Sequence, residues 1–159
     1  MIIILDSCSL INLSNAKVLD KIFYLEGISF IIPFAVLDEC KSIKGHLDQL
    51  INEEILLLDE ETIDIKTYEE ILNKYKLGDG ETECISLCKI TGHIMCSDDN
   101  RARKSGIKEL GNENVIGSLR LLNYLSQERI ISCSELSTAY YLMKSSGGFI
   151  PNLNPRTLC

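Results

Sequence analysis

Short, wholly apolar runs alternate along the chain with longer segments in which apolar residues recur at helical spacing. Residues 2–5 (IIIL) and 28–32 (ISFII) are runs of the kind found in strands covered on both faces, and 93–97 (HIMCS) is a third. Helical spacing follows them at 7–25, 34–45 and 98–106. This alternation predicts an α/β domain with a parallel sheet between helical layers.

The remaining segments are less uniform. Residues 47 to 65 are ambiguous, because HLDQLINEE (46–54) has helical spacing while ILLLD (55–59) and TIDIK (62–66) resemble short strands. Amphipathic helices are expected at 67–78 and 79–92, and each ends in glycine. Residues 106–114 form a turn-rich passage, after which two further helices are expected, at 115–130 and 134–148. With 159 residues and no internal repeat, we expect a single domain over residues 1–159.

Composition narrows the class of protein. The 45% hydrophobic and 25% charged content is that of an ordinary globular chain. A formal charge of -7 argues against a protein that coats nucleic acid, because non-specific binding needs many Lys and Arg contacts to phosphate. It does not exclude an enzyme that meets phosphate through metal ions held by acidic residues.

The chain lacks the sequence features of export. The apolar opening, MIIIL, is too short for a signal peptide, and no apolar run approaches the ~18 residues of a membrane span. We therefore expect a cytoplasmic protein with no membrane association. The seven cysteines are odd in number and lie in apolar segments, which favours buried thiols over a disulfide framework. Cys84 and Cys88 share a predicted helix, but no further ligands complete a zinc site.

Acidic residues follow two of the predicted strands directly. Asp6 comes after 2–5, and Asp98 and Asp99 come after 93–97. Because ligands of parallel α/β sheets gather beyond the carboxyl ends of the strands, these acids are expected at one edge of the sheet. Glu39, after the second strand, and Glu81, in the first turn of a helix, could face the same edge.

Carboxylates crowded at one point repel each other unless a cation neutralises them. Hard oxygen donors of this kind suit Mg²⁺ or Mn²⁺. One or two such ions could orient a water and stabilise charge on a phosphate during in-line attack, which predicts phosphodiester hydrolysis. The sequence has no glycine-rich phosphate loop with its lysine, no Gly-x-Ser-x-Gly and only two histidines, so no other chemistry is indicated.

Each acid also has a purely structural interpretation. Asp6 or Asp98 could cap the following helix, although a cap needs one acid and here two are adjacent. Glu81 could serve only the helix dipole. The rivals within the same segments are Asp38, Asp79 and Glu83.

The basic residues after the aspartate pair have two interpretations as well. Arg103 and Lys104 fit the solvated face of a helix. Arg101, one turn from Asp98, is the better candidate to touch an acid or a substrate phosphate.

Four segments together resemble the PIN domain nucleases. They are IIILDSCSLINL, PFAVLDE, LGDGETECISLC and MCSDDNRARKSG, which align the family's acids with Asp6, Glu39, Glu81 and Asp98 and an accessory acid with Asp99. NVIGSLRLL and LMKSSGGFIP resemble the C-terminal part of a bacterial and archaeal branch of predicted nucleic-acid-binding PIN proteins, so the resemblance covers essentially the whole chain.

The resemblance implies more than the pattern does. It implies a three-layer α/β/α fold, an Mg²⁺- or Mn²⁺-dependent ribonuclease, frequent homodimers and, in many members, a toxin bound by an antitoxin. Ser7, Ser9 and Asn12 lie where family members hold metal waters or orient the first acid, and Ser7, Asn12 and Arg101 are the expected substrate contacts.

The sequence therefore supports three hypotheses. The first is a metal-dependent endoribonuclease in which Asp6, Glu39, Glu81 and Asp98 hold the ions, with Asp99 supporting. The second is a non-catalytic PIN-like module that binds RNA or a protein. The third, a phosphoacceptor signalling domain, needs a lysine after a later strand that the sequence does not place.

Overall fold

A parallel sheet forms the centre of the structure, a computed structural model that describes residues 1–59 and 63–159. Its five strands lie in the order β3-β2-β1-β4-β5, and every neighbouring pair is parallel. The strands are β1 (Ile2–Leu5), β2 (Ser29–Pro33), β3 (Leu57–Asp59), β4 (Ile94–Cys96) and β5 (Val115–Ile116). The predicted parallel sheet and its three main strands are confirmed.

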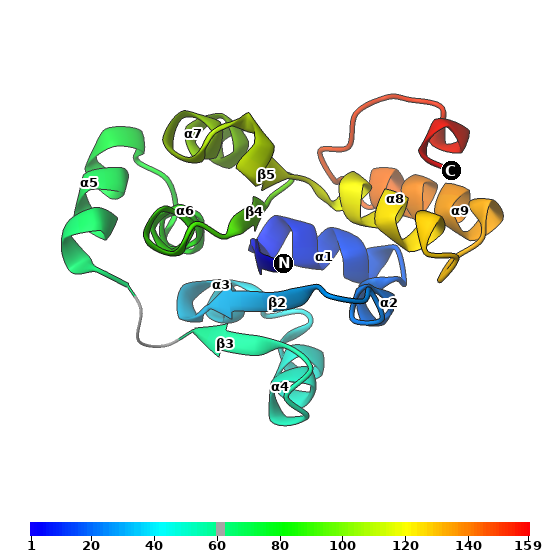
Figure 1. Cartoon of the computed structure of the whole chain (residues 1–159), viewed down its shortest axis with the longest axis horizontal. Helices are drawn as coiled ribbons and strands as arrows, with labels where there is room; N and C mark the ends of the chain where they lie inside the picture. Colours follow the sequence, from blue (N-terminus) through cyan, green and yellow to red (C-terminus); the bar gives the residue numbers. More distant parts are fainter. Residues whose placement is uncertain (60–62) are drawn as a thin grey trace.

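Helices cover both faces of this sheet. In Figure 1 the layer on one side contains α5 (Ile65–Tyr75), α6 (Asp79–Thr91) and α7 (Asn100–Leu110). The other side contains α1 (Ser7–Asn15), α2 (Leu19–Ile22), α8 (Ser118–Gln127) and α9 (Cys133–Ser145). α3 (Phe34–Glu39) and α4 (Lys44–Asn52) follow β2, and α6 contacts β1, β2 and β4. The three-layer α/β/α fold is confirmed.

The first two predicted helices are interrupted in the structure. The segment 7–25 divides into α1 and α2 because Lys17 adopts a left-handed conformation with φ of 59°. The segment 34–45 ends at Glu39, and Gly45, expected to close it, lies inside α4. Apolar spacing alone continues through such a break, since it records which face is buried and not the backbone angle.

Three other segments differ from the pattern. TIDIK was expected as a strand, but Ile65 and Lys66 begin α5 after an Asp64 cap that accepts from Thr67 N, while Thr62 lies outside the described residues. Residues 106–110, expected as turns, complete α7. Val115–Ile116, expected as the start of a helix, pairs with β4 as β5, because a two-residue strand is too short to show a period.

The register of the sheet sets the position of the site. Leu5 pairs with Cys96, so the next residues, Asp6 and Ser97, leave the sheet side by side. Asp6 N donates to Cys96 O at 3.0 Å, and Ser97 N donates to Ile116 O at 3.1 Å. The β1 side chains from Ile3 to Leu5 are fully buried between the helical layers, which fixes this register.

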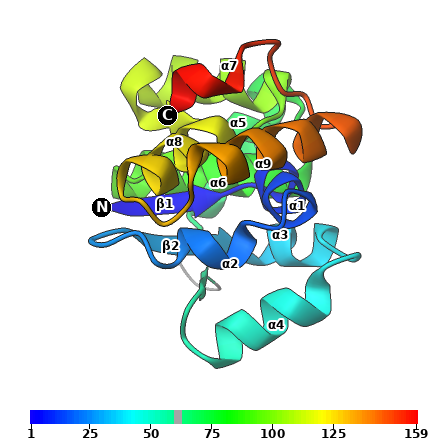
Figure 2. The same ribbon diagram turned by 90° about the vertical axis from the view of Figure 1, so that its right-hand side faces the viewer.

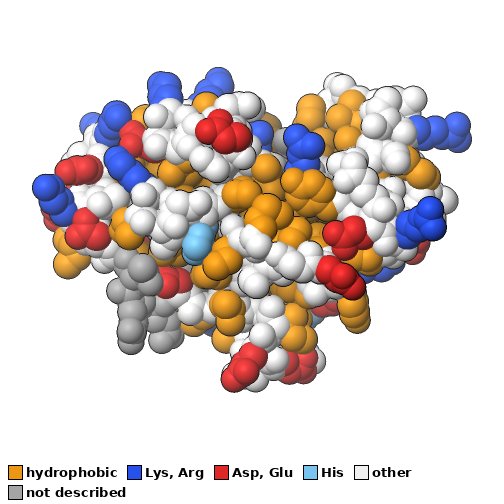
Figure 3. Space-filling view, in the orientation of Figure 1, with side chains coloured by type: hydrophobic (Ala, Val, Ile, Leu, Met, Phe, Trp, Pro, Cys, Tyr) orange, Lys and Arg blue, Asp and Glu red, His pale blue; other side chains and the backbone are white. Residues whose placement is uncertain are grey.

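The two ends of the strands differ in character. β1 begins on the face seen in Figure 3, where hydrophobic side chains gather between the α6–α7 and α8–α9 sides. β1 passes into α1 on the opposite side, at the right of Figure 2, where the segment after α9 also lies.

None of the helices within residues 1–59 and 63–159 has the length and apolar content needed to cross a membrane.

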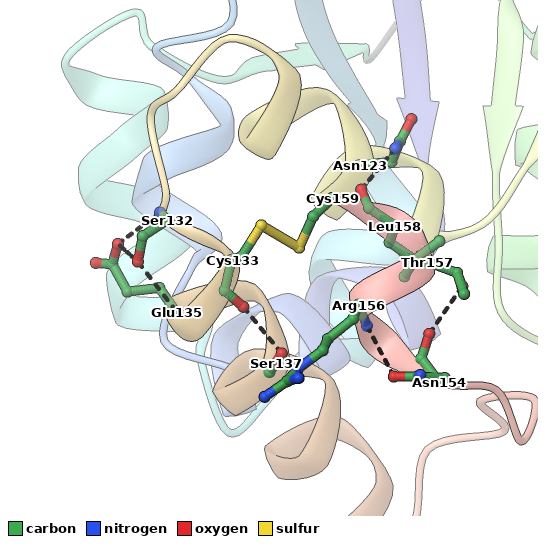
Figure 4. Close-up of a disulfide and its surroundings, with 10 residues drawn as sticks. All are labelled: Asn123, Ser132, Cys133, Glu135, Ser137, Asn154, Arg156, Thr157, Leu158 and Cys159. Carbon is green, nitrogen blue, oxygen red and sulfur yellow. Dashed lines mark hydrogen bonds between the residues drawn. A yellow bond between two sulfur atoms is a disulfide. The ribbon is translucent and has the colours of Figure 1, made fainter.

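A disulfide between Cys133 and Cys159 ties the end of the chain to the start of α9 (Figure 4). The 3-10 helix η2 (Pro155–Leu158) lies against α8 and α9, and Asn123 Nδ2 donates to Leu158 O at 2.7 Å. The expectation of seven thiols is therefore wrong for these two cysteines, which are 26 residues apart and meet only through this packing. The other five are free, and all but Cys8 are buried.

Candidate active site

Asp6 is the most deeply buried of the predicted acids, with none of its surface exposed. It follows β1 directly, and its Oδ2 accepts from Ser97 Oγ at 2.5 Å while Oδ1 accepts from Ser7 Oγ at 3.4 Å. Burial, together with the charges of Glu81 and Glu39, raises the pKa of Asp6 to about 7 despite the hydrogen bond from Ser97. The structure therefore holds a carboxyl whose charge is disfavoured at the end of the central strand.

Glu39 reaches the same point from the end of α3. Its Oε2 accepts from Ser7 Oγ at 2.8 Å, and its Oε1 accepts from Gly80 N at 3.0 Å. A Cβ atom on Gly80 would lie 2.6 Å from Glu39 Oε2, so any other residue at position 80 would displace this carboxylate. The Ser7 hydroxyl thus lies between the carboxylates of Glu39 and Asp6, and its single proton is directed to the nearer acceptor, Glu39.

Glu81 lies in the first turn of α6 and is half-buried. Its Oε2 accepts from Gly78 N at 3.0 Å, which is the backbone half of a capping box. Burial raises the pKa of Glu81, and the charges of Asp99 and Glu39 raise it further against the opposing effect of the Gly78 hydrogen bond. Glu81 thus has a structural role at the start of α6, where only an interaction with the helix dipole was predicted, and its pKa responds to the other acids as well.

Asp98 has a different environment from the acids around it. Its Oδ1 accepts from Ser118 N at 2.9 Å, and its Oδ2 accepts from Asn12 Nδ2 at 2.7 Å and Ser118 Oγ at 2.6 Å. A Cβ atom on Gly117 would come within 2.8 Å of Asp98 Oδ1. Asp98 therefore joins α1 to the start of α8 through a buried network that occupies both of its oxygens.

Asp99 caps α7. Its Oδ1 accepts from the backbone N–H groups of Arg101 and Ala102, both at 2.8 Å. Asp99 N in turn donates to Ser97 Oγ at 3.2 Å, so Ser97 connects Asp99 to Asp6. The helix cap that the sequence suggested for Asp98 is therefore made by Asp99. It uses only one of the two carboxylate oxygens of Asp99.

The rivals of the predicted acids are engaged elsewhere. Asp38 lies 3.8 Å from Lys44 Nζ on the exposed side of α3. Asp79 accepts from Tyr68 Oη at 2.8 Å, and Glu83 accepts from Ala35 N at 2.9 Å at the start of α3. None of these contacts involves Asp6, Ser7 or Ser97.

One of the three basic residues, Arg103, differs from its predicted position. Arg101 Nη2 donates to Lys76 O at 3.1 Å, at the end of α5, and its charge opposes the rise in the pKa of Glu81. Arg103, interpreted from sequence as a solvated residue, is partly buried, and its Nη1 donates to Ser97 O at 2.9 Å. Lys104 is exposed.

The acids fit a hard divalent cation in their chemistry. Within residues 1–59 and 63–159, no three His, Cys, Asp or Glu side chains are already drawn together as a metal-binding group. The charges of Glu81 and Glu39 nevertheless raise the pKa of Asp6, and those of Asp99 and Glu39 raise the pKa of Glu81. Oxygen donors that repel each other in this way are suited to Mg²⁺ or Mn²⁺.

Sequence reasoning missed the residues that arrange the acids. Ser97 and Ser118 donate to Asp6 and Asp98, while Gly80 and Gly117 leave room for the carboxylates of Glu39 and Asp98. Ser97 alone carried a usable signal, since it stands between a predicted strand and two acids.

Comparison with known proteins agrees with the geometry. A family model described as a PIN domain matches residues 2–153, nearly the whole chain, whereas neither the curated proteins nor the solved structures give a match. PIN domains are in general nucleases that use divalent metal ions, which makes this chain a nuclease-type module. The chain belongs to the PIN domain family.

Proposed function

We propose that the protein is a metal-dependent endoribonuclease that hydrolyses RNA phosphodiester bonds at the carboxyl edge of its sheet. One observation carries the proposal: the Ser7 hydroxyl lies between the carboxylates of Glu39 and Asp6, and Ser97 Oγ donates to Asp6 while it accepts from the backbone N–H of Asp99. None of the ion pairs in the described part of the chain includes these three acids or Glu81. A cation bound from solution would therefore neutralise the charges of these acids.

Asp6, Glu39 and Glu81, with the Asp98–Asp99 pair, are the residues that would hold Mg²⁺ or Mn²⁺. When bound, such an ion activates a water and neutralises charge on the scissile phosphate. Within the pair, Asp98 is hydrogen-bonded through both oxygens and fixes the backbone, while the charge of Asp99 raises the pKa of Glu81. Asp98 is accordingly the positioning member and Asp99 the member nearer the ion.

The other polar residues orient these acids. Ser7 and Ser97 hold Asp6 between them, and Asn12 holds Asp98. Ser7 and Asn12, expected as substrate contacts, thus act on the acids themselves. Arg101 supplies positive charge beside Glu81, where an incoming phosphate would pass.

Purified protein, Mn²⁺ and a labelled RNA of mixed sequence test the proposal. We expect cleavage that EDTA abolishes and that Asp6→Asn and Asp98→Asn remove. Asp38→Asn is the matched control, because Asp38 neighbours Glu39 in sequence but pairs with Lys44. Cleavage that survives Asp6→Asn, or that needs no metal, would contradict the proposal.

A non-catalytic module that binds RNA or a protein is the second candidate. It is favoured by the absence of a ready-formed metal group among the described residues and by the fully occupied carboxylate of Asp98. RNA binding without cleavage, under Mn²⁺ concentrations that change the thermal stability of the protein, would support this module and exclude the enzyme.

The biological setting belongs to the same proposal. A toxin role with an antitoxin over the site, a homodimer and a cytoplasmic location follow from the family resemblance. Co-expression with the product of the adjacent gene and mass measurement of the purified assembly test the first two. A partner that suppresses cleavage in stoichiometric amounts is the expected result for a toxin.

A further inference from the structure

The turn after α9 presents an aromatic side chain to solvent beside the acids. Ile150 N donates to Gly148 O at 2.8 Å, which closes a three-residue turn with Phe149 at its tip. Phe149 is 73% exposed, whereas the next residue, Ile150, is buried. A large apolar side chain is thus held outward although its neighbour enters the core.

The backbone of this turn is fixed to the acidic site. A Cβ atom on Gly148 would lie 2.6 Å from Asn12 Oδ1, so the turn approaches Asn12 as closely as glycine allows. Asn12 is the residue whose amide holds Asp98. On the other side of the turn, Tyr140 Oη donates to Pro151 O at 2.9 Å. Phe149 therefore keeps a defined position relative to the acids.

Two cavities meet at Phe149, and both reach Asp98. One, of about 450 Å³, lies between α7 and the segment after α9 and is also lined by Asn100 and Arg103. The other, of about 240 Å³, is also lined by Cys8 and Asp99. The larger cavity falls within the usual size of a small-molecule site, and it combines an apolar wall with a guanidinium group.

We propose that Phe149 is a stacking platform for a nucleobase of single-stranded RNA, and that Arg103 meets the adjoining phosphate. The inference rests on the proposed nuclease function and adds to it the means of positioning the strand. An exposed aromatic ring accepts the π-face of any base, and Arg provides the positive charge that a phosphate needs. Arg103 Nη1 is anchored on Ser97 O, so the guanidinium is held at the end of β4.

A third cavity extends this path beyond the acids. It measures about 820 Å³, and its lining contains Phe34, two lysines and three acids: Lys41, Lys44, Asp38, Glu39 and Asp79. Phe34 is 50% exposed, and the hydrogen bonds through Ser7 connect this cavity with Asp6. Because Lys44 is paired with Asp38 and Asp48, the feature that this cavity shares with those at Phe149 is its exposed aromatic ring and not a positive charge.

The chain contains no tryptophan, which permits a direct test. Phe149→Trp introduces a single reporter, and its emission is measured while a ten-nucleotide single-stranded RNA is titrated in EDTA. Tyr24→Trp is the matched control, because Tyr24 is 71% exposed and lines none of the three cavities. We expect RNA to quench the emission at position 149 and leave that at position 24 unchanged.

A second pair of variants measures the contribution of the ring. Phe149→Ala should weaken RNA binding about tenfold, as expected for the loss of one stacked base, while Tyr24→Ala leaves it unchanged. Failure of the unmodified chain to bind RNA, unchanged emission at position 149 on saturation, or full affinity of Phe149→Ala would overturn the inference. So would a concentration-dependent change of emission without RNA, which would assign the ring to a contact between copies of the chain.

These measurements do not depend on hydrolysis, because EDTA removes divalent ions. Quenching at position 149 without cleavage in Mn²⁺ would support the stacking site and contradict the proposed nuclease function. A chain that cleaves RNA equally well with Phe149→Ala retains the nuclease and loses the stacking site. The two failures are therefore distinguishable.

Discussion

Two buried acids of this protein respond to burial in opposite ways. Glu109, on α7, accepts hydrogen bonds from Lys74, Lys89 and Tyr75, each at 2.7 Å, and its side chain is only 7% exposed. Burial alone would raise its pKa, but these partners lower the pKa of Glu109 to about 2. Asp6, with acids as neighbours, has its pKa raised to about 7.

The contrast shows that the fold can neutralise a buried acid with its own lysines and does so away from the carboxyl edge. At the edge, the described residues provide serine hydroxyls and backbone N–H groups to the acids, and no ion pair to Asp6. Hydrogen bonds orient a carboxylate without cancelling its charge. The carboxyl edge of the sheet is therefore suited to reversible binding of a cation. The cluster of Glu109 with Lys74, Lys89 and Tyr75 is suited to a structural role.

The largest difference between the carboxyl edge and the Glu109 cluster should appear in the rate of RNA cleavage. Asp6→Asn removes a proposed ligand and should lower Mn²⁺-dependent RNA cleavage by at least ~100-fold, since a bound ion supplies several kcal/mol of transition-state stabilisation. Glu109→Gln, at a buried acid outside the edge, should leave cleavage within about threefold when assayed well below its melting temperature. Equal losses in both variants would break the comparison.

The pH dependence of stability should follow the pKa of Asp6. Its folded pKa of about 7 lies above the unfolded value, so the protonated form stabilises the fold at low pH, and this stability is lost as pH rises from about 4 through 7. In EDTA, the Asp6→Asn variant should not show this loss. Its free energy of unfolding at pH 8 should exceed that of the unmodified chain by on the order of 3 kcal/mol. Chemical denaturation at pH 5 and pH 8 measures both.

Added Mn²⁺ provides the control for that experiment. The ion should stabilise the unmodified chain at pH 8 and have a smaller effect on Asp6→Asn, because binding to the folded state alone raises its stability. An Asp6→Asn variant that is less stable than the unmodified chain at pH 8 in EDTA would contradict the interpretation of Asp6 as an uncompensated acid.

The contribution of Glu109 to stability should depend on pH with the opposite sign. Its folded pKa of about 2 lies below the unfolded value, so its stabilising effect is complete above about pH 4.5 and is lost as pH falls through 2. Glu109→Gln should therefore lower the free energy of unfolding by about 2 kcal/mol at pH 7 and by less at pH 3. Glu70→Gln, at an exposed position of α5, is the control and should change stability by less than about 0.5 kcal/mol.

Gly80→Ala should give the smallest effect and the most local one. The added Cβ would meet Glu39 and displace its carboxylate, so we expect roughly tenfold slower cleavage with a nearly unchanged melting temperature. Gly45→Ala occupies the same second position of a helix, in α4, with nothing within 4 Å of the added atom. That variant should keep full activity; comparable losses from both alanines would remove Glu39 from the proposed site.

The sequence predicted the α/β fold because its apolar strands are short and continuous. The β1 run from Ile2 to Leu5 can be buried on both faces only inside a parallel sheet with helical layers. Strand ends then locate Asp6, Asp98 and Asp99 at one edge, which the register of β1 and β4 confirms. Their roles as ligands stay a prediction.

Tertiary structure alone decided how the acids are held. That Asp98 is saturated by Asn12 and Ser118 while Asp99 caps α7 could not be inferred from two adjacent identical residues. The disulfide, β5 and the position of Phe149 likewise depend on how distant segments meet. Local sequence determines which faces are buried and where strands end, because these follow from periodicity. The partner of each polar group is decided only when the layers close and bring distant residues within hydrogen-bonding distance, such as Asp6 and Ser97, which are 91 positions apart.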